Sequence, residues 1–142
     1  MQVKVVRLTA KVKLPQYQHS GDSCVDLANA GKNIILKPFS REIVPTGIKV
    51  AVPDSFELQV RPRSGLALKK GITVLNAPGT IDSGYRGEVC VILYNSSNKT
   101  VKIKTGERIA QAAFCKVEKV CWQEVKNLNK TKRNEGGFGS TG

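Results

Sequence analysis

The sequence is poor in the side chains that build metal clusters. It has a single histidine, His19, and four cysteines, no two of which are separated by two residues. A structural zinc site needs four such ligands, usually in closely spaced pairs. We therefore expect no zinc site, and three cysteines in apolar strand-like runs are expected to be buried free thiols. The four cysteines are Cys24, Cys90, Cys115 and Cys121.

Long hydrophobic runs are also missing. No stretch of about 18 apolar residues occurs, and the N-terminal residues alternate charged with apolar instead of forming the apolar part of a signal peptide. We therefore expect a soluble protein with no membrane partner. Its expected location is the cytoplasm, or the nucleus if the source is eukaryotic or viral.

Acidic residues are few beside basic ones. The chain has 11 Asp and Glu against 23 Lys and Arg, a net charge of +12. Three interpretations are open: a solvated basic surface, attraction for a small polyanion, or nucleic-acid binding. Only residues 126–133 are densely basic, and no strand-like run interleaves basic with aromatic residues. A nucleic-acid partner is therefore not expected.

The hydrophobic pattern repeats every two residues rather than every 3.6. Residues 56–61 and 101–104 alternate apolar with polar, and residues 43–52 and 88–94 are rich in β-branched side chains between turn residues. Only residues 66–70 suggest a helix, of one or two turns. Many short strands separated by turns predict an all-β sandwich, jelly roll or barrel.

The chain divides into a β body, residues 1–125, and a polar tail, residues 126–142. The tail is rich in Asn and Lys and then in Gly, so it cannot bury much of its own surface. Phe138 among these glycines is unusual for a linker and suggests a flap that closes over a ligand. A flexible terminus is the simpler alternative.

Two segments carry residues suited to phosphate chemistry. Arg63-Ser64-Gly65 offers backbone N–H groups and a guanidinium to an anion, or it is an ordinary turn in which Ser64 caps a helix. Residues 76–87 form a long loop between two apolar strands that could wrap a ligand. Asp82 in this loop is either a general base or a polar loop residue.

Two further segments are weaker in isolation. Gln111 follows a turn and enters a strand, where a surface glutamine would be ordinary. The tail places Ser140 and Thr141 after Arg133, and these groups could hold phosphates or belong to a flexible end.

Together and in this order, the segments resemble the five motifs of the trimeric dUTP pyrophosphatase (dUTPase) family. Those motifs correspond to residues 20–30, 61–67, 76–88, 106–111 and 133–142, and residues 45–48 match a further family pattern.

Two positions depart from the family pattern. Ser23-Cys24-Val25 stand where the first motif usually has small residues and an aromatic. Asn134 stands where the fifth usually has glycine, and asparagine tolerates the left-handed backbone region better than most residues.

The resemblance implies a distorted jelly roll, or β-clip barrel, that forms a homotrimer with active sites between subunits. Residues 126–142 would be a mobile arm that closes over the site of a neighbouring subunit. The implied reaction converts dUTP to dUMP and pyrophosphate, which clears dUTP from the nucleotide pool and supplies dUMP for dTMP synthesis. Asp82 would activate the water that attacks the α-phosphorus. Mg²⁺ would bridge the triphosphate, with Asp26 holding one of its waters.

The resemblance also implies the substrate contacts. The groups expected on the α- and β-phosphates are Arg63, Ser64, Gly65 and Gln111. Those expected on the γ-phosphate are Arg133, Ser140 and Thr141. Those expected to bind the uracil edge are Asn76 and the backbone near Gly79, Thr80, Ile81 and Cys90. Tyr85 would lie under the deoxyribose and exclude a 2′-hydroxyl, and Phe138 would stack on the base.

Three alternatives differ from this interpretation. A dCTP deaminase shares this fold and much of the third motif, but it carries a catalytic glutamate where this chain has Ile92, and it lacks the glycine-rich tail. A basic nucleic-acid-binding module is the alternative from a different class. An inactive family member is the third alternative, and it is disfavoured because Asp82, Arg63, Ser64, Tyr85 and Gln111 are all present.

Overall fold

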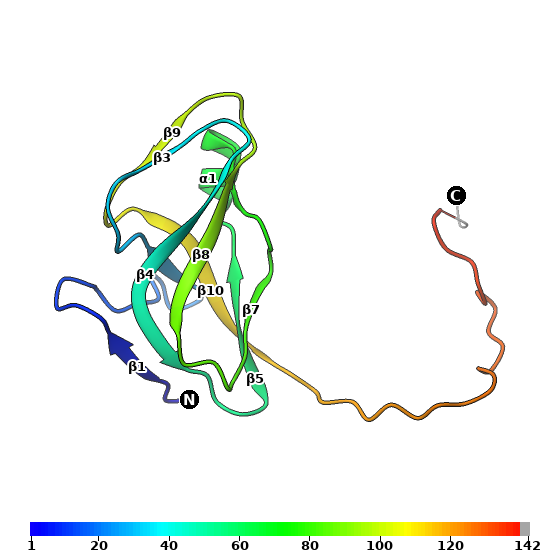
Figure 1. Cartoon of the computed structure of the whole chain (residues 1–142). Helices are drawn as coiled ribbons and strands as arrows, with labels where there is room; N and C mark the ends of the chain where they lie inside the picture. The colour runs from blue at the N-terminus through cyan, green and yellow to red at the C-terminus, as the bar shows by residue number, and fades with distance from the viewer. Residues whose placement is uncertain (140–142) are drawn as a thin grey trace.

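The computed structural model describes residues 1–139, which form two four-stranded antiparallel sheets and one smaller sheet (Figure 1). The first sheet has the order β1-β4-β8-β6 and the second has the order β2-β10-β5-β7. The first contains β1 (Lys4–Arg7), β4 (Arg41–Ala51), β6 (Ile72–Val74) and β8 (Glu88–Asn95). The second contains β2 (Val25–Ala28), β5 (Phe56–Arg61), β7 (Gly79–Ile81) and β10 (Arg108–Lys116). This is the expected all-β jelly roll.

The core lies between the two large sheets and follows from the period-two pattern. Along β8 every second residue is buried, and β5 buries Leu58 and Val60 in the same way. Such alternation places one face of each strand in the core and leaves the other to solvent or to a partner. Among residues 1–139, no buried side-chain nitrogen or oxygen lacks a hydrogen bond.

A two-stranded sheet pairs β3 (Ile34–Leu36) with β9 (Val101–Ile103) at the end of the body that also carries the helix (Figure 1). Two fully buried asparagines hold its ends. Asn29 Nδ2 donates to the Lys32 and Lys104 carbonyls, and Asn95 Nδ2 donates to the Lys37 and Lys99 carbonyls. Each amide therefore ties together two segments that are distant in the sequence.

The single helix in residues 1–139 is α1 (Ser64–Lys70). As predicted, it is short and ends at Gly71, whose left-handed backbone (φ 66°) is one that glycine adopts without strain. The alternative role for Ser64 as a helix cap is wrong: Arg63 occupies the cap position, with no side-chain capping bond, and Ser64 is the first helical residue. No helix in this part of the chain is long and apolar enough to span a bilayer.

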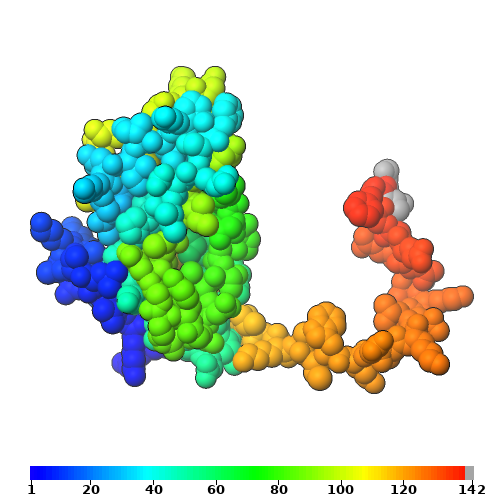
Figure 2. Space-filling model, in the orientation of Figure 1, coloured from blue at the N-terminus to red at the C-terminus, as the bar shows by residue number. Residues whose placement is uncertain are grey.

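Several strand boundaries were predicted within one or two residues, but three expectations changed. The loop at residues 76–87 contains β7, which forms because its backbone pairs with β5. Cys24, Cys90 and Cys115 are only half-buried, and Cys121 is exposed. Cys90 alternates with buried Val89 and Val91, so it lies on the face of β8 turned away from the core. Residues 117–139 contain no strand or helix and lead away from the body (Figures 1 and 2).

Candidate functional site

The order β2-β10-β5 brings three of the sequence motifs side by side. Gln111 on β10 pairs with Asp26 on β2 and, on its other side, with Arg61 on β5. Arg63 follows β5 directly. Hydrogen bonding between the strands therefore gathers side chains that lie far apart in the sequence.

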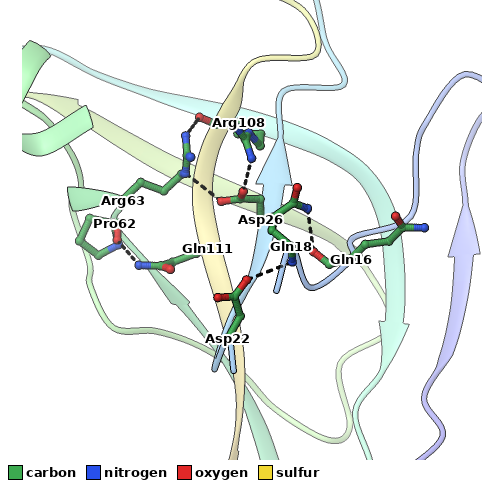
Figure 3. Close-up of polar contacts among 8 residues, drawn as sticks. All are labelled: Gln16, Gln18, Asp22, Asp26, Pro62, Arg63, Arg108 and Gln111. Carbon is green, nitrogen blue, oxygen red and sulfur yellow. Dashed lines mark hydrogen bonds and ion pairs between the residues drawn. The ribbon is translucent and has the colours of Figure 1, made fainter. Parts of the chain in front are cut away.

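Asp26 is held by two arginines (Figure 3). Its Oδ1 lies 2.8 Å from Arg63 Nε, and its Oδ2 lies 2.9 Å from Arg108 Nη1. Arg63 Nη1 also donates to the Arg108 carbonyl at 3.0 Å. The Asp26 side chain is only 18% exposed, so these charged bonds are partly shielded from water. We call Asp26, Arg63, Arg108 and Gln111 the Asp26 cluster.

Gln111 is oriented by the chain that leads to α1. Its Nε2 donates to the Pro62 carbonyl at 2.9 Å, which leaves its Oε1 free to accept a bond (Figure 3). Gln111 and Asp26 also line a pocket of about 240 Å³ whose other walls come from residues 18–24. Asp22 shapes that wall, because its Oδ2 accepts the N–H groups of Gln18 and His19.

Ser64 and Gly65 begin α1 beside Arg63, and both are exposed. The first N–H groups of a helix have no partner within the helix and are available to acceptors. A Cβ at Gly65 would meet no atom within 4 Å, so the space in front of this turn is open. The segment therefore presents donors to solvent next to the Asp26 cluster.

The segment after β7, residues 82–87, is exposed and is organised differently; we call it the Asp82 loop. Among residues 1–139, the Asp82 side chain makes no hydrogen bond or ion pair, although its carbonyl accepts the Tyr85 N–H at 3.1 Å. The Tyr85 hydroxyl donates to the Glu88 carbonyl at 3.1 Å, and its ring lies against Gly87. Arg86 Nη1 donates to the carbonyls of Ser83 and Tyr85 and so closes the turn.

The residues expected to contact uracil flank this loop. The Asn76 amide lies against buried Gly79, where a Cβ would approach its Nδ2 to 3.0 Å. Thr80 is exposed and Ile81 is half-buried on β7. Burial and the nearby Glu88 carboxylate raise the pKa of the Cys90 thiol, so it stays protonated at neutral pH.

The Asp26 cluster and the Asp82 loop do not meet within one chain. Ile81 pairs with Leu58 and β7 runs antiparallel to β5, so Asp82 lies level with Glu57. That position is six residues before Arg63, or about 20 Å along the strand direction. A single chain therefore presents two separate half-sites.

Arg133, Asn134 and Phe138 lie on the segment that leaves the body. Arg133 Nε donates to the Gly136 carbonyl at 2.8 Å. Asn134 adopts a left-handed backbone with φ 41° and exchanges bonds with Thr131: its Oδ1 accepts the Thr131 N–H, and its N–H donates to the Thr131 hydroxyl. Phe138 is fully exposed. Ser140 and Thr141 lie outside the described residues.

The acidic residues fit a magnesium ion held through water but not a protein cage. No three His, Cys, Asp or Glu side chains in residues 1–139 gather into a metal site. Each Asp26 oxygen takes one arginine contact and keeps acceptor capacity for a water. An ion that retains most of its waters and binds a triphosphate needs only one or two carboxylates from the protein.

Sequence reasoning missed Arg108. It lies in the fourth motif, but nothing in the sequence indicated a role for it. Arg108 and Asp26 are 82 positions apart in the sequence, and only the pairing of β10 with β2 brings their side chains into contact. Gly87 was missed as well. Its lack of a Cβ leaves room for the Tyr85 hydroxyl, which would lie 2.2 Å from such an atom.

Comparison with known proteins gives a consistent result. Residues 10–142 match the family model described as dUTPase. A deoxyuridine 5'-triphosphate nucleotidohydrolase from Fusobacterium nucleatum is 51% identical, covering 100% of this chain and 97% of the relative. One from Hydrogenobaculum sp. is 52% identical, covering 100% of this chain and 99% of the relative.

Solved structures resemble the fold closely at lower identity. The dUTPase of Staphylococcus bacteriophage 80alpha with dUpNHpp has a TM-score of 0.89 at 23% identity, covering 99% of this chain and 98% of that chain. A mutant dUTPase of phage phi11 of S. aureus, studied for its coordination of a structural Mg(II) ion, has a TM-score of 0.82 at 19% identity. It covers 90% of this chain and 99% of that chain.

Proposed function

The chain belongs to the dUTPase family and is a dUTP diphosphatase, and we propose that it works by attack of a water, activated by Asp82, on the α-phosphorus of dUTP. The products would be dUMP and pyrophosphate, so the enzyme would lower dUTP and supply dUMP for dTMP synthesis. The observation that carries the phosphate-binding part of this proposal is the pairing of β2, β10 and β5, which gathers the residues of three motifs at one place. The exposed Asp82 carboxylate supports the part concerning the base.

Two members of the Asp26 cluster, together with the first residues of α1, would bind the phosphates. Arg63, Ser64, Gly65 and Gln111 offer a guanidinium, a hydroxyl, backbone N–H groups and an amide to the α- and β-phosphates. Arg63 is bound to Asp26 in this structure, so gripping phosphate requires it to share or leave that carboxylate. Arg108 then keeps Asp26 in place, since its ion pair involves the other oxygen.

Magnesium would neutralise charge on the triphosphate and the leaving pyrophosphate. Asp26 is the residue of this chain that would hold it, through a bound water. The dUTPase neighbour studied for its Mg(II) coordination supports the choice of ion.

The hairpin that contains β7 supplies base and sugar selection. Asn76 and the backbone of Gly79, Thr80, Ile81 and Cys90 would bind the uracil edge, and the narrow hairpin would exclude the methyl group of thymine. Tyr85, fixed by its bond to the Glu88 carbonyl, would pack under the deoxyribose and leave no space for a 2′-hydroxyl. The dUTP analogue bound to the phage 80alpha dUTPase supports this substrate class.

Asp82 is the proposed general base. Its carboxylate is exposed and has no side-chain partner among residues 1–139, so it is free to accept a proton from an attacking water. The water would attack in line with the departing pyrophosphate, and catalysis would depend on positioning and charge neutralisation.

A complete site then needs more than one chain, which supports a homotrimer. The separation of Asp82 from Arg63 requires a second copy to bring the two half-sites together. Residues 117–139 leave the body (Figure 2). They expose apolar side chains. Trp122 is 91% exposed and Leu128 is 85% exposed, and a neighbouring subunit would cover them.

Residues 126–142 are the proposed arm that closes over the site. Phe138 would stack on the uracil, and Arg133 with Ser140 and Thr141 would hold the γ-phosphate. The mutual bonds of Thr131 and Asn134 give the arm a defined bend where the family usually has glycine.

Pyrophosphate release tests this function. It is measured with dUTP, dTTP, dCTP and UTP, each with and without Mg²⁺. We expect pyrophosphate release from dUTP with Mg²⁺ and little release from the other nucleotides. Equal release from nucleotides that differ in base or sugar would contradict the proposed role of the hairpin in selecting uracil and deoxyribose. Uracil nucleotide formed from dCTP would indicate a deaminase. That outcome is not favoured, because Ile92 offers no group for acid–base chemistry.

Analytical ultracentrifugation tests the assembly separately. A sedimenting species of three subunits is expected. An active monomer would contradict a site shared between chains.

A further inference from the structure

Seven lysines surround one end of the molecule, away from the Asp82 loop. They lie in three segments, residues 29–37, 64–71 and 95–107, which together contain one acidic residue, Glu107. Their net charge is +6, half of the +12 of the whole chain. We call this surface the lysine cap; its members are Lys32, Lys37, Lys69, Lys70, Lys99, Lys102 and Lys104, all exposed.

The fold, not the sequence, builds the lysine cap. Asn29 and Asn95, exposed by 1% and 0%, tie the segments that carry four of the lysines to the two ends of the β3-β9 sheet. Lys102 lies in the middle of that sheet, opposite Ile35. The lysines are therefore anchored through a rigid backbone, while their side chains remain in solvent.

An open groove of about 660 Å³ runs between α1 and β9 within the lysine cap. Lys69 and Lys70 line it from the helix, and Lys99 and Lys102 line it from the other side. Of these four lysines, only Lys70 has an ion-pair partner within residues 1–139, Glu107 Oε1 at 2.7 Å. Partial burial raises the pKa of Glu107, but its bonds from Lys70 and the Lys104 N–H, with the charges of those lysines, outweigh burial and hold the pKa below its ordinary value.

The groove lacks what a compact ligand would need. Within residues 1–139 no arginine lines it, and the one nearby carboxylate, Glu107, is already paired with Lys70, so the groove has no bidentate clamp to fix an orientation. Lysines are flexible point charges that suit a chain of phosphates, whose affinity comes largely from release of counterions. An extended polyanion fits this lining better than a small molecule.

An exposed aromatic side chain lies next to the lysine cap. Phe39 is 63% exposed and has φ 54°, a conformation that a bulky residue adopts only under strain. Its turn is anchored, because Ser40 donates to the Lys37 carbonyl and accepts the Asn95 N–H. An exposed ring on an anchored turn beside lysines is suited to stacking on an unpaired base.

We propose that the lysine cap binds single-stranded nucleic acid, with its lysines on the phosphates and Phe39 stacked on a base. The sequence alone did not predict this partner, because the lysines lie in three separate segments that only the fold brings together. The proposal is independent of how dUTP is hydrolysed, since none of these residues belongs to the Asp26 cluster or the Asp82 loop.

Fluorescence anisotropy with a labelled thymidine oligonucleotide of about 20 residues tests the proposal. Thymine is chosen so that the base is not the one expected in the active site. The titration is repeated between about 50 and 200 mM salt. We compare the wild type with a variant carrying Lys69→Gln, Lys99→Gln and Lys102→Gln. The control carries Lys4→Gln, Lys11→Gln and Lys49→Gln, with the same loss of charge elsewhere.

The lysine cap variant should bind more weakly, and the slope of log K against log salt should become shallower by about 2, for three phosphate contacts on a single strand. The control should keep most of the wild-type affinity and slope. Phe39→Gly, which suits the backbone of this turn, should weaken binding by about fivefold or more through lost stacking. In all three variants kcat/KM for dUTP should be unchanged.

Four results would overturn the proposal. One is no binding by the wild type, and another is an equal loss in the control, which would mean that net charge alone matters. A third is competition by inorganic polyphosphate that equals competition by unlabelled oligonucleotide at the same phosphate concentration, which would mean that base stacking contributes nothing to binding. Unchanged oligonucleotide affinity with a lower, salt-dependent kcat/KM for dUTP would assign these lysines to steering the substrate instead.

Discussion

The Asp26 cluster and the Asp82 loop, the two half-sites of this chain, are built by different means. In the Asp26 cluster, Asp26, Arg63 and Gln111 are half-buried and Arg108 is exposed, and each side chain is held by a hydrogen bond or ion pair to a residue distant in the sequence. The Asp82 loop is exposed and is closed by local bonds, while its carboxylate has no partner among residues 1–139. The groups proposed to bind phosphate are thus already ordered within one chain, whereas the carboxylate proposed as the base is not held by any contact in the described part of the chain.

The sharpest test of this contrast is Asp82→Asn. If Asp82 only removes a proton, the change should lower kcat by about 10²–10⁴-fold and leave dUTP binding close to wild type, since the hairpin and the Asp26 cluster are intact. Single-turnover kinetics together with calorimetric binding of a non-hydrolysable dUTP analogue would measure both. Retained turnover would remove Asp82 from this role.

Removal of residues 136–142 tests whether a third region completes the two half-sites. Loss of a closing arm should reduce kcat by about 10²-fold through poorer positioning, with little change in the melting temperature of the body. Steady-state rates and thermal unfolding give the two readouts. An unchanged rate would mean that the segment is only a terminus.

Arg108→Gln tests the organisation of the Asp26 cluster. Removal of one of the two partners of Asp26 should free its carboxylate to close more tightly on Arg63, and should weaken magnesium-dependent activity by about 10–100-fold. The measurement is the magnesium dependence of kcat/KM. Lys116→Gln is the matched control, because it breaks only the exposed pair with Glu118, which is worth little. Equal effects of Arg108→Gln and Lys116→Gln would mean that the ion pair of Arg108 with Asp26 does not contribute specifically to magnesium-dependent activity.

Gly87→Ala tests the sugar contact of the Asp82 loop. Its new methyl group would clash with the Tyr85 hydroxyl, so the ring must move and the preference for dUTP over UTP should fall by about tenfold. Gly84→Ala is the control, because a Cβ there meets no atom within 4 Å. The measurement is the ratio of kcat/KM for dUTP to kcat/KM for UTP in each variant. An unchanged ratio in Gly87→Ala would mean that the position of the Tyr85 ring does not determine sugar selection.

The smallest expected effect concerns Glu107, which links α1 to the turn before β10. Its pKa is lower in the folded state, so its contribution to stability is present above the ordinary pKa of glutamate and is lost as the pH falls through the folded value. A partly exposed pair of this kind is worth less than about 1 kcal/mol. Chemical unfolding at neutral pH and below pH 4 should show the difference between wild type and Glu107→Gln vanishing in acid.

The sequence predicted the positions of strands better than it predicted which side chains contact one another. The alternation of apolar and polar residues over 56–61 predicted the bounds of β5, because a strand that buries one face places every second side chain in the core. It did not reveal β7, whose three residues become a strand only by pairing with β5. The motifs named most residues of the Asp26 cluster but not their ion pairs, which depend on strands meeting across the sheet.

The sequence by itself determined the all-β fold, the short helix that ends at Gly71 and the order of motifs that marks the family. These follow from local features: period-two burial, residues that favour turns, and chemical groups at fixed spacing. Only the tertiary structure decided that Asp26 lies between Arg63 and Arg108, and that lysines from three segments share one end of the body. Both depend on long-range strand pairing and on two buried asparagines, and no local pattern encodes which distant segments will meet.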